Sequence, residues 1–225
     1  MKRVVFAIVI LLMVTTSFGQ DGDKKLRLGL SGTPGVSWLS SDYDKVENDA
    51  SRLSFKFGIN MDYQLMDNYF FSTGIFMHNV KGKLKYNDGI PFMIEDTLVN
   101  FTPGVSVGYK LQYVEIPIGL KLKTNEIGYF TYYARFGLNP MFNINAVGDA
   151  NQESVVSANI NEEVIFINLG WHVGGGLEYS LSSNFILFGG INYRQGFIDV
   201  THNTKNREDD KTILSGINLD LGIFF

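Results

Sequence analysis

Apolar and polar residues alternate along most of the chain that follows residue 25. The clearest stretch is residues 53–65, where apolar side chains occupy every odd position from Leu53 to Leu65 and polar residues or glycine occupy the even ones. Successive side chains of a β-strand point to opposite faces, so this stretch predicts a strand with one apolar and one polar face. This part of the chain has no sustained repeat of 3.6 residues, which argues against long helices.

The same alternation predicts eight strands. They cover residues 25–39, 53–65, 69–85, 105–123, 130–145, 164–179, 185–198 and 213–225. The seventh is the least regular, because Ile186 and Phe188 fall among its polar positions. Most of these segments exceed the roughly 9–11 residues that cross a bilayer, so we expect the strands to extend beyond a membrane at one end.

The connections between the predicted strands alternate in length. Short connections rich in Asn, Asp, Ser and Gly, typical of hairpin turns, occur at residues 66–68, 124–128 and 180–184. Long connections occur at residues 40–51, 87–104, 146–163 and 199–211. This alternation is typical of an outer-membrane barrel with short periplasmic turns, periplasmic termini and long extracellular loops. We therefore predict an all-β fold, an eight-stranded antiparallel up-and-down transmembrane β-barrel.

The content of the polar face distinguishes a membrane barrel from a soluble one. A soluble barrel such as a lipocalin has an apolar interior, whereas a membrane barrel has lipid outside and a polar lumen. The polar face of this chain mixes charges of both signs with glycine and asparagine, which suits a narrow lumen of mutually paired side chains. The residues predicted to form this lumen network are Lys56, Asp62, Glu115, Lys121, Arg135, His172, Glu178, Arg194 and Asp220.

Two local predictions concern the fourth strand and the hairpin that follows it. If the turn around residues 125–126 is regular, Glu115 and Arg135 are diagonal neighbours on the polar face and can pair. The apolar positions of the fourth strand also shift from odd to even at Tyr113 and Val114. A β-bulge at these two residues would return both halves of the strand to a single face.

The start of the chain predicts a cleavable signal peptide. A positively charged start that includes Lys2 precedes an apolar run at residues 4–14, and Gly19 is a small residue of the kind that a signal peptidase requires. The run is much shorter than the roughly 20 residues of a membrane-spanning helix, which argues against a helical anchor. We predict a signal peptide at residues 1–19 and a single barrel domain at residues 20–225.

Composition narrows the possible partners. Apolar residues make up 45% of the chain, aromatic residues 14%, and there are 24 glycines, which suits a sheet with two extended faces and many turns. A formal net charge of −4 without a basic run predicts no nucleic-acid partner. The chain has no cysteine, so disulfides and thiolate metal sites are excluded.

Two motifs resemble those of a known family. Residues 113–123, YVEIPIGLKLK, resemble the Y-x-E-I-P-x-x-L-K stretch of PorT-like outer-membrane β-barrel proteins of the Bacteroidetes. The carboxyl terminus resembles the signal read by the barrel-assembly machinery, through Leu219, Leu221, Ile223 and Phe225. The resemblance implies a bacterial outer-membrane barrel whose partners are outer-membrane lipid and, during insertion, the barrel-assembly machinery. Some members are linked to type IX secretion and gliding, and many have no assigned activity.

The long connections hold the remaining candidate sites. One contains five consecutive apolar residues, Ile90, Pro91, Phe92, Met93 and Ile94. Such a run is unexpected on a water-facing loop unless it forms a lid over the barrel mouth or contacts a partner, and we favour the lid. The long loops are also acidic, which would allow divalent cations to bridge them to anionic glycolipid, although solvation alone accounts for such charge.

The sequence contains no recognisable catalytic or metal-binding motif. Metalloprotease, nucleophile-elbow and EF-hand patterns are absent, and the histidines are scattered at His78, His172 and His202. We therefore expect no cofactor, and we interpret the chain as a non-enzymatic barrel. It would support the envelope or serve as an accessory to a surface or secretion complex through its outer loops. The alternatives are a narrow channel or small-solute-binding barrel and a lipid-modifying enzyme.

Overall fold

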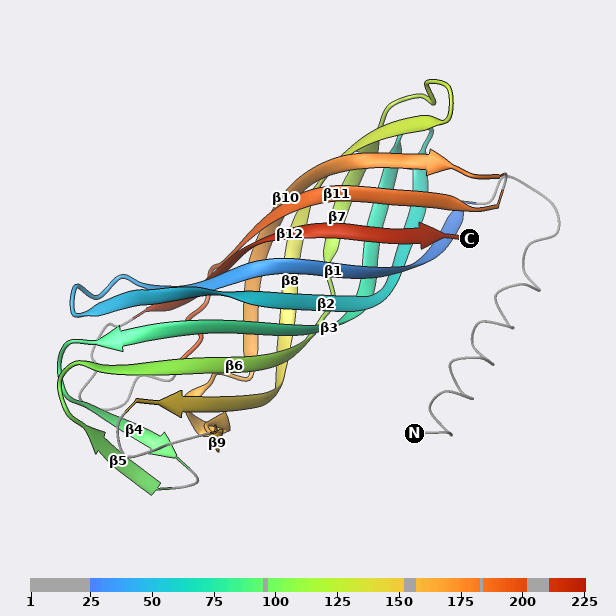
Figure 1. The fold of residues 1–225 in the computed structure, drawn as a ribbon. Coiled ribbons are helices and arrows are strands. Elements are labelled where there is room, and N and C mark those ends of the chain that lie inside the picture. Colours follow the sequence, from blue (N-terminus) through green and yellow to red (C-terminus); the bar gives the residue numbers. More distant parts are fainter. Residues whose placement is uncertain (1–24, 95–96, 152–156, 183, 202–210) are drawn as a thin grey trace, which may run out of the picture.

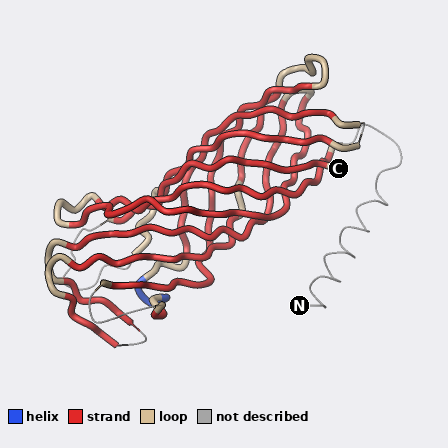
Figure 2. The backbone as a smooth tube through the Cα atoms, viewed as in Figure 1, coloured by secondary structure: helices blue, strands red, loops and turns tan. Residues whose placement is uncertain are grey.

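The computed structural model describes residues 25–94, 97–151, 157–182, 184–201 and 211–225, so the predicted signal peptide lies outside it. Most of the described residues lie in strands, with most turns and loops at the two ends of the barrel (Figure 2). The strands of the wall are β1 (Leu26–Ser41), β2 (Val46–Met66), β3 (Tyr69–Tyr86), β6 (Val105–Glu115), β7 (Ile118–Lys123), β8 (Phe130–Ala150), β10 (Ile167–Ser180), β11 (Ile186–Gly196) and β12 (Thr212–Phe224). The other elements are the hairpin of β4 (Ile90–Ile94) and β5 (Thr97–Phe101), the short strand β9 (Ala158–Asn159) and the 3-10 turn η2 (Asn161–Glu163). Within the described residues, no helix is both long and apolar enough to cross a membrane.

The wall closes into a ring of eight antiparallel strands (Figure 1). Each strand pairs with the next along the chain, and β1 pairs with β12 from Gly29 opposite Phe224 to Ser41 opposite Thr212. β6 and β7 are two halves of one wall strand, since both pair with β3 on one side and with β8 on the other. The predicted eight-stranded up-and-down barrel is confirmed.

The two ends of the barrel differ in their connections and in how far the strands extend. At one end, which we call the turn end, short connections join β2 to β3, β7 to β8 and β10 to β11, and the carboxyl terminus lies beside them (Figure 1). The opposite end, which we call the loop end, carries the longer connections. β2 and β8, which extend into it, are each 21 residues long. Parts of the predicted loops at residues 40–51 and 146–163 are therefore strand, because antiparallel pairing continues beyond the predicted strand ends.

The outer wall between the two ends carries an extended apolar surface. Leu53, Ile75 and Ile191 point away from the barrel and are 78%, 61% and 63% exposed. Other exposed residues of this belt are Phe55, Phe57, Phe136, Leu138, Val173, Leu187, Ile217, Leu219 and Leu221. Exposed apolar area costs about 25 cal/mol per Å² in water, so a belt of this extent requires lipid around it.

Near the loop end, the inward face of the wall becomes apolar and the outward face becomes polar. On β3, the inward residues beyond His78 form a buried and largely apolar series that includes Val80, Leu84 and Tyr86. The outward residues change over the same interval to lysines, Lys81, Lys83 and Lys85. We call this part of the wall, residues 80–86, 105–112 and 145–150, the collar. A polar outside and an apolar inside are typical of a barrel in water, so the collar stands above the lipid.

This exchange also explains the shift of apolar positions at Tyr113 and Val114. Odd-numbered residues point inward along both β6 and β7, including Tyr113, Glu115 and Lys121, so the strand does not change face. The predicted β-bulge at these two residues is therefore wrong. The irregularity of the ladder lies on β8, where Ile144 is an extra residue between the partners of Tyr113 and Gln112.

The interior of the collar is an apolar core. Its members include Leu39, Leu84, Val105, Val107, Leu111, Ala146, Ile160 and Val164. The β4–β5 hairpin adds Phe92 and Phe101 to this core, with the Phe92 ring 6.2 Å from that of Tyr109. The hydroxyls of Tyr86 and Tyr109 form a hydrogen bond of 2.5 Å within it. Side chains from the wall and the hairpin thus fill the barrel at its loop end.

Substitution on the two faces of the collar is expected to have unequal effects. Leu84→Ala removes buried methyl groups and should lower the free energy of unfolding by about 2–5 kcal/mol. Lys85→Gln, on the adjacent outward face, should change it by less than about 0.5 kcal/mol. Denaturant unfolding of the barrel in lipid vesicles, followed by tryptophan fluorescence, measures both. Similar values for the two variants would contradict a packed interior.

Candidate functional site: the charged network of the lumen

The polar face of the wall brings together the charged residues that the sequence assigned to the lumen. Lys56, Asp62, Glu115, Lys121, His172, Glu178, Arg194 and Asp220 are all buried, and Arg135 is half-buried among them. They come from β2, β6, β7, β8, β10, β11 and β12, so the site is built by register around the ring rather than by any local motif. Two clusters form along the barrel axis.

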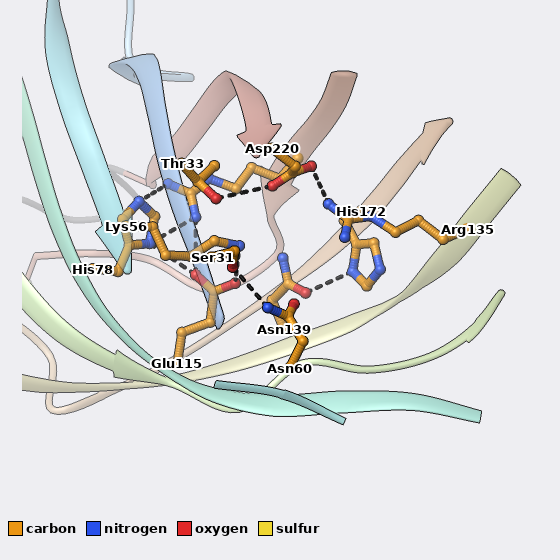
Figure 3. A network of polar contacts seen from close by, with 11 residues as sticks. Ser31, Thr33, Lys56, Asn60, His78, Glu115, Arg135, Asn139, His172 and Asp220 are labelled. Carbon is orange, nitrogen blue, oxygen red and sulfur yellow. Dashed lines mark hydrogen bonds and ion pairs between the residues drawn. The ribbon is translucent and has the colours of Figure 1, made fainter. Parts of the chain in front are cut away.

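The first cluster is centred on Glu115, which is fully buried (Figure 3). Its carboxylate accepts hydrogen bonds from Lys56 Nζ at 3.2 Å and from Arg194 at 2.9 Å. His78 Nδ1 lies 2.8 Å from Glu115 Oε2, the oxygen that also accepts from Arg194, and the His78 ring contacts Arg194 as well. His78 was not among the predicted network residues, although its even position on β3 places it on the inward face.

Further polar contacts lie near this cluster in the lumen (Figure 3). Arg135 forms an ion pair with Asp220, which also accepts a hydrogen bond from the Thr33 hydroxyl at 3.1 Å. His172 Nδ1 lies 2.6 Å from Asn139 Oδ1. Both lumen histidines are thus engaged with protein groups on the inside of the wall.

The second cluster lies nearer the turn end and is centred on Lys121. Its ammonium lies 2.8 Å from Asp62 and 2.6 Å from Glu178. Glu178 also accepts a hydrogen bond from Lys123 at 2.6 Å. Inward aromatic rings surround the two ammonium groups at cation–π distance: Phe70, Tyr133, Phe188 and Phe224. Lys123 was not among the predicted network residues. Phe188, which looks like an irregularity in the alternation of β11, is an inward ring that lies against the Lys121 ammonium.

The predicted pair of Glu115 with Arg135 does not form. Lys121, rather than Glu115, lies opposite Arg135 in the ladder, and Glu115 lies opposite Met141. The hairpin turns around Gly128, which has a φ of 68°, so the register is displaced from the one assumed for a turn at residues 125–126. Arg135 therefore meets Asp220 across the lumen instead.

Little empty space remains between these side chains. A cavity of about 20 Å³ lies among Lys56, Glu115, Arg135 and Asp220, which is room for about one water molecule. A wider vestibule of about 790 Å³ opens at the turn end, with Arg27, Lys123 and Glu178 among its lining residues. The lumen therefore has a water-accessible mouth at the turn end and a closed middle.

The remaining predicted residues occupy the loop end and the outer wall. Phe92 is buried in the collar core and Ile94 packs against it, while Pro91 is half-buried and the side chains of Ile90 and Met93 lie outside the described part. The residues of the assembly motif, Leu219, Leu221, Ile223 and Phe225, face outward at or near the end of β12. His202 lies outside the described residues. Among the described residues, no three His, Cys, Asp or Glu side chains gather as a metal site.

Three solved structures are similar to this chain at low sequence identity. Neisserial surface protein A (NspA) is similar with a TM-score of 0.53 and 14% identity, over 91% of this chain and 98% of that chain. OprG from Pseudomonas aeruginosa has a TM-score of 0.46 and 11% identity, over 90% of this chain and 97% of that chain. Ail of Yersinia pestis has a TM-score of 0.35 and 14% identity, over 88% of this chain and 98% of that chain.

The family is established by sequence. No curated protein matches the chain significantly. Residues 17–202 match the family model described as outer membrane protein beta-barrel domain. Because this match spans more than half of the chain, the protein belongs to the outer membrane protein β-barrel domain family, and it resides in the bacterial outer membrane.

Proposed function

We propose that this protein is a non-enzymatic barrel that supports the envelope or serves as an accessory to a surface or secretion complex through its loop end. The observation that supports this proposal is the filled interior. Ion-paired side chains leave a lumen cavity of only about 20 Å³, and the apolar collar core lies between that network and the loop end. The cavity beside Glu115 has room for about one water molecule, and apolar side chains of the described residues pack together in the collar core.

The β4–β5 hairpin is the part of the loop end best suited to a partner. In the described residues, β4 and β5 pair only with each other, so this two-stranded sheet has free edges. A free edge can pair with a strand of another protein through main-chain hydrogen bonds. Leu98 is 52% exposed on the hairpin, whereas Phe92 and Phe101 anchor it to the collar core.

The resemblance to PorT-like proteins of the Bacteroidetes supports a secretion complex of the type IX kind as the partner. The segment that carries the resemblance, residues 113–123, supplies Glu115 to the first cluster and Lys121 and Lys123 to the second. Pro117 lies at the interruption between β6 and β7. The shared motif therefore concerns how the interior is built, and the partner would be recognised by the loop end.

A small-solute-binding barrel is the second candidate. The vestibule of about 790 Å³ at the turn end is large enough for a small ligand, and Arg27 and Lys123 lie in its lining. A lipid-modifying enzyme has less support. His78 and His172 are 0% and 6% exposed and face the lumen, where a lipid at the outer wall does not reach them.

The closed interior predicts that the purified barrel produces no stable ion conductance in planar lipid bilayers. A variant in which a short glycine linker replaces residues 89–102 should also stay closed, because the ion-paired clusters remain below the removed hairpin. Stepwise conductance from the unaltered protein would instead favour the channel.

Unchanged lipid A masses in cells with and without the protein would argue against the lipid enzyme, and changed masses would support it.

The accessory role predicts a partner at the hairpin. A photo-reactive amino acid at position 98 should capture a discrete envelope protein in native membranes. The same amino acid at Tyr129, exposed at the turn end, should not capture that protein. The proposal would be contradicted if position 98 captured nothing and the envelope of cells lacking the protein kept its normal resistance to detergent.

The clusters should stabilise the fold rather than support a reaction. Glu115→Gln leaves Lys56 and Arg194 without their buried carboxylate and is expected to lower the free energy of unfolding by about 3–5 kcal/mol. Glu126→Gln, at the exposed turn, should change it by less than about 0.5 kcal/mol. Denaturant unfolding in lipid vesicles compares the two variants. Equal stability of Glu115→Gln and the unaltered barrel would contradict the structural role.

A further inference from the structure

The outside of the collar carries a basic groove. It has a volume of about 370 Å³ and lies against β2, β3, β6 and β8. The charged residues that line it are Arg52, Lys81, Lys83, Lys110 and Asp149. Neither the lumen network nor the β4–β5 hairpin contributes to this groove. Its location on the outer wall gives it access to the surroundings of the barrel rather than to the lumen.

The positive charge of the groove is only partly balanced by the protein. Lys83 pairs with Asp49 at 2.5 Å, and Lys110 pairs with Asp149 at 2.6 Å. The hydrogen bond from Lys83 lowers the pKa of Asp49. Burial opposes ionisation of Asp149, but hydrogen bonds from Lys110 and from the backbone N–H of Ser157 outweigh it, so the pKa of Asp149 is also lowered. Both pairs therefore remain ionised at neutral pH.

Two cations of the groove have no such partner. Within the described residues, neither Arg52 nor Lys81 forms an ion pair, although both are exposed. Lys81 lies directly opposite Lys110 in the ladder between β3 and β6. Like charges at directly opposed positions of a sheet reduce its stability, and an anion between them would remove the repulsion. The groove is thus arranged for an anionic ligand.

The neighbouring surface indicates which anion this is. Leu53 and Phe55 are exposed on β2 next to Arg52, and Met77 and Val114 face outward on β3 and β6 on the membrane side of the lysines. The groove therefore borders the apolar belt at the level where lipid gives way to water. A molecule with acyl chains on the belt and a phosphate above them would match both surfaces.

We propose that this groove binds the phosphate of an anionic glycolipid in the outer leaflet, with Arg52 and Lys81 as its principal ligands. Lys83 and Lys110, fixed by their aspartates, line the same groove. The proposal rests on the location in the outer membrane and is independent of any partner at the hairpin. The acyl chains of the glycolipid lie along the apolar belt, which restricts the ligand to membrane lipids.

Native mass spectrometry of the folded barrel, released from phosphatidylcholine nanodiscs that contain bis-phosphorylated lipid A, tests this site. The variant Arg52→Gln/Lys81→Gln should bind lipid A more weakly, on the order of tenfold, because two cations near a membrane surface are lost. The control Lys25→Gln/Lys211→Gln removes the same charge outside the groove and should bind as the unaltered barrel does. Lipid A without phosphates should bind no better than phosphatidylcholine, and millimolar inorganic phosphate should not displace the phosphorylated lipid.

Three results would overturn the proposal. Equal retention by the Arg52→Gln/Lys81→Gln variant and the unaltered barrel would show that the groove is not the site. Equal retention of lipid A with and without phosphates would show that the charge is not recognised. Displacement by inorganic phosphate would identify a free anion as the ligand. Unfolding measurements on both variants establish that each is folded before lipid binding is compared.

Discussion

The structure depends on one constraint. A charged side chain inside an eight-stranded barrel is almost fully removed from water, so another side chain must neutralise it. Glu115 accordingly holds two cations and a histidine, and Glu178 lies against both Lys121 and Lys123. These contacts join strands that are not neighbours in the ladder, such as β2 with β6 and β6 with β11. The ladder closes the ring, and the ion pairs hold its opposite sides together.

The same wall meets a different constraint at its loop end. Beyond Val80 on β3, the outside faces water and the inward residues of the wall are mostly apolar, so they pack into a core. A single strand therefore carries two opposite patterns, one suited to lipid and one suited to water. The hairpin of β4 and β5 completes the second core with Phe92 and Phe101, which gives an apolar run in a loop a structural purpose.

Much of the wall was predictable because the period of two is local. The alternation from Leu53 to Leu65 defined both faces of β2, and the inward charges followed from it. Pairing across the lumen was not predictable, because it depends on the register of every hairpin; a turn at Gly128 was enough to move Arg135 from Glu115 to Asp220. The shift at Tyr113 was misinterpreted for another reason. A passage of the wall from lipid into water and a reversal of side-chain direction both shift the apolar positions from odd to even, so the sequence pattern alone does not distinguish them.

The lysines on the outside of the collar have a consequence for biogenesis. To reach the far side of the bilayer, Lys81, Lys83 and Lys110 must each traverse hydrocarbon once, at about 2–4 kcal/mol per charge at the midplane. Asp49 and Asp149 lie on adjacent strands, so hairpins that traverse together carry counter-ions for two of these lysines. Lys81 has none among the described residues. Passage of the β3–β6 hairpin is therefore the step of insertion at which a catalyst that thins or opens the bilayer accelerates assembly most.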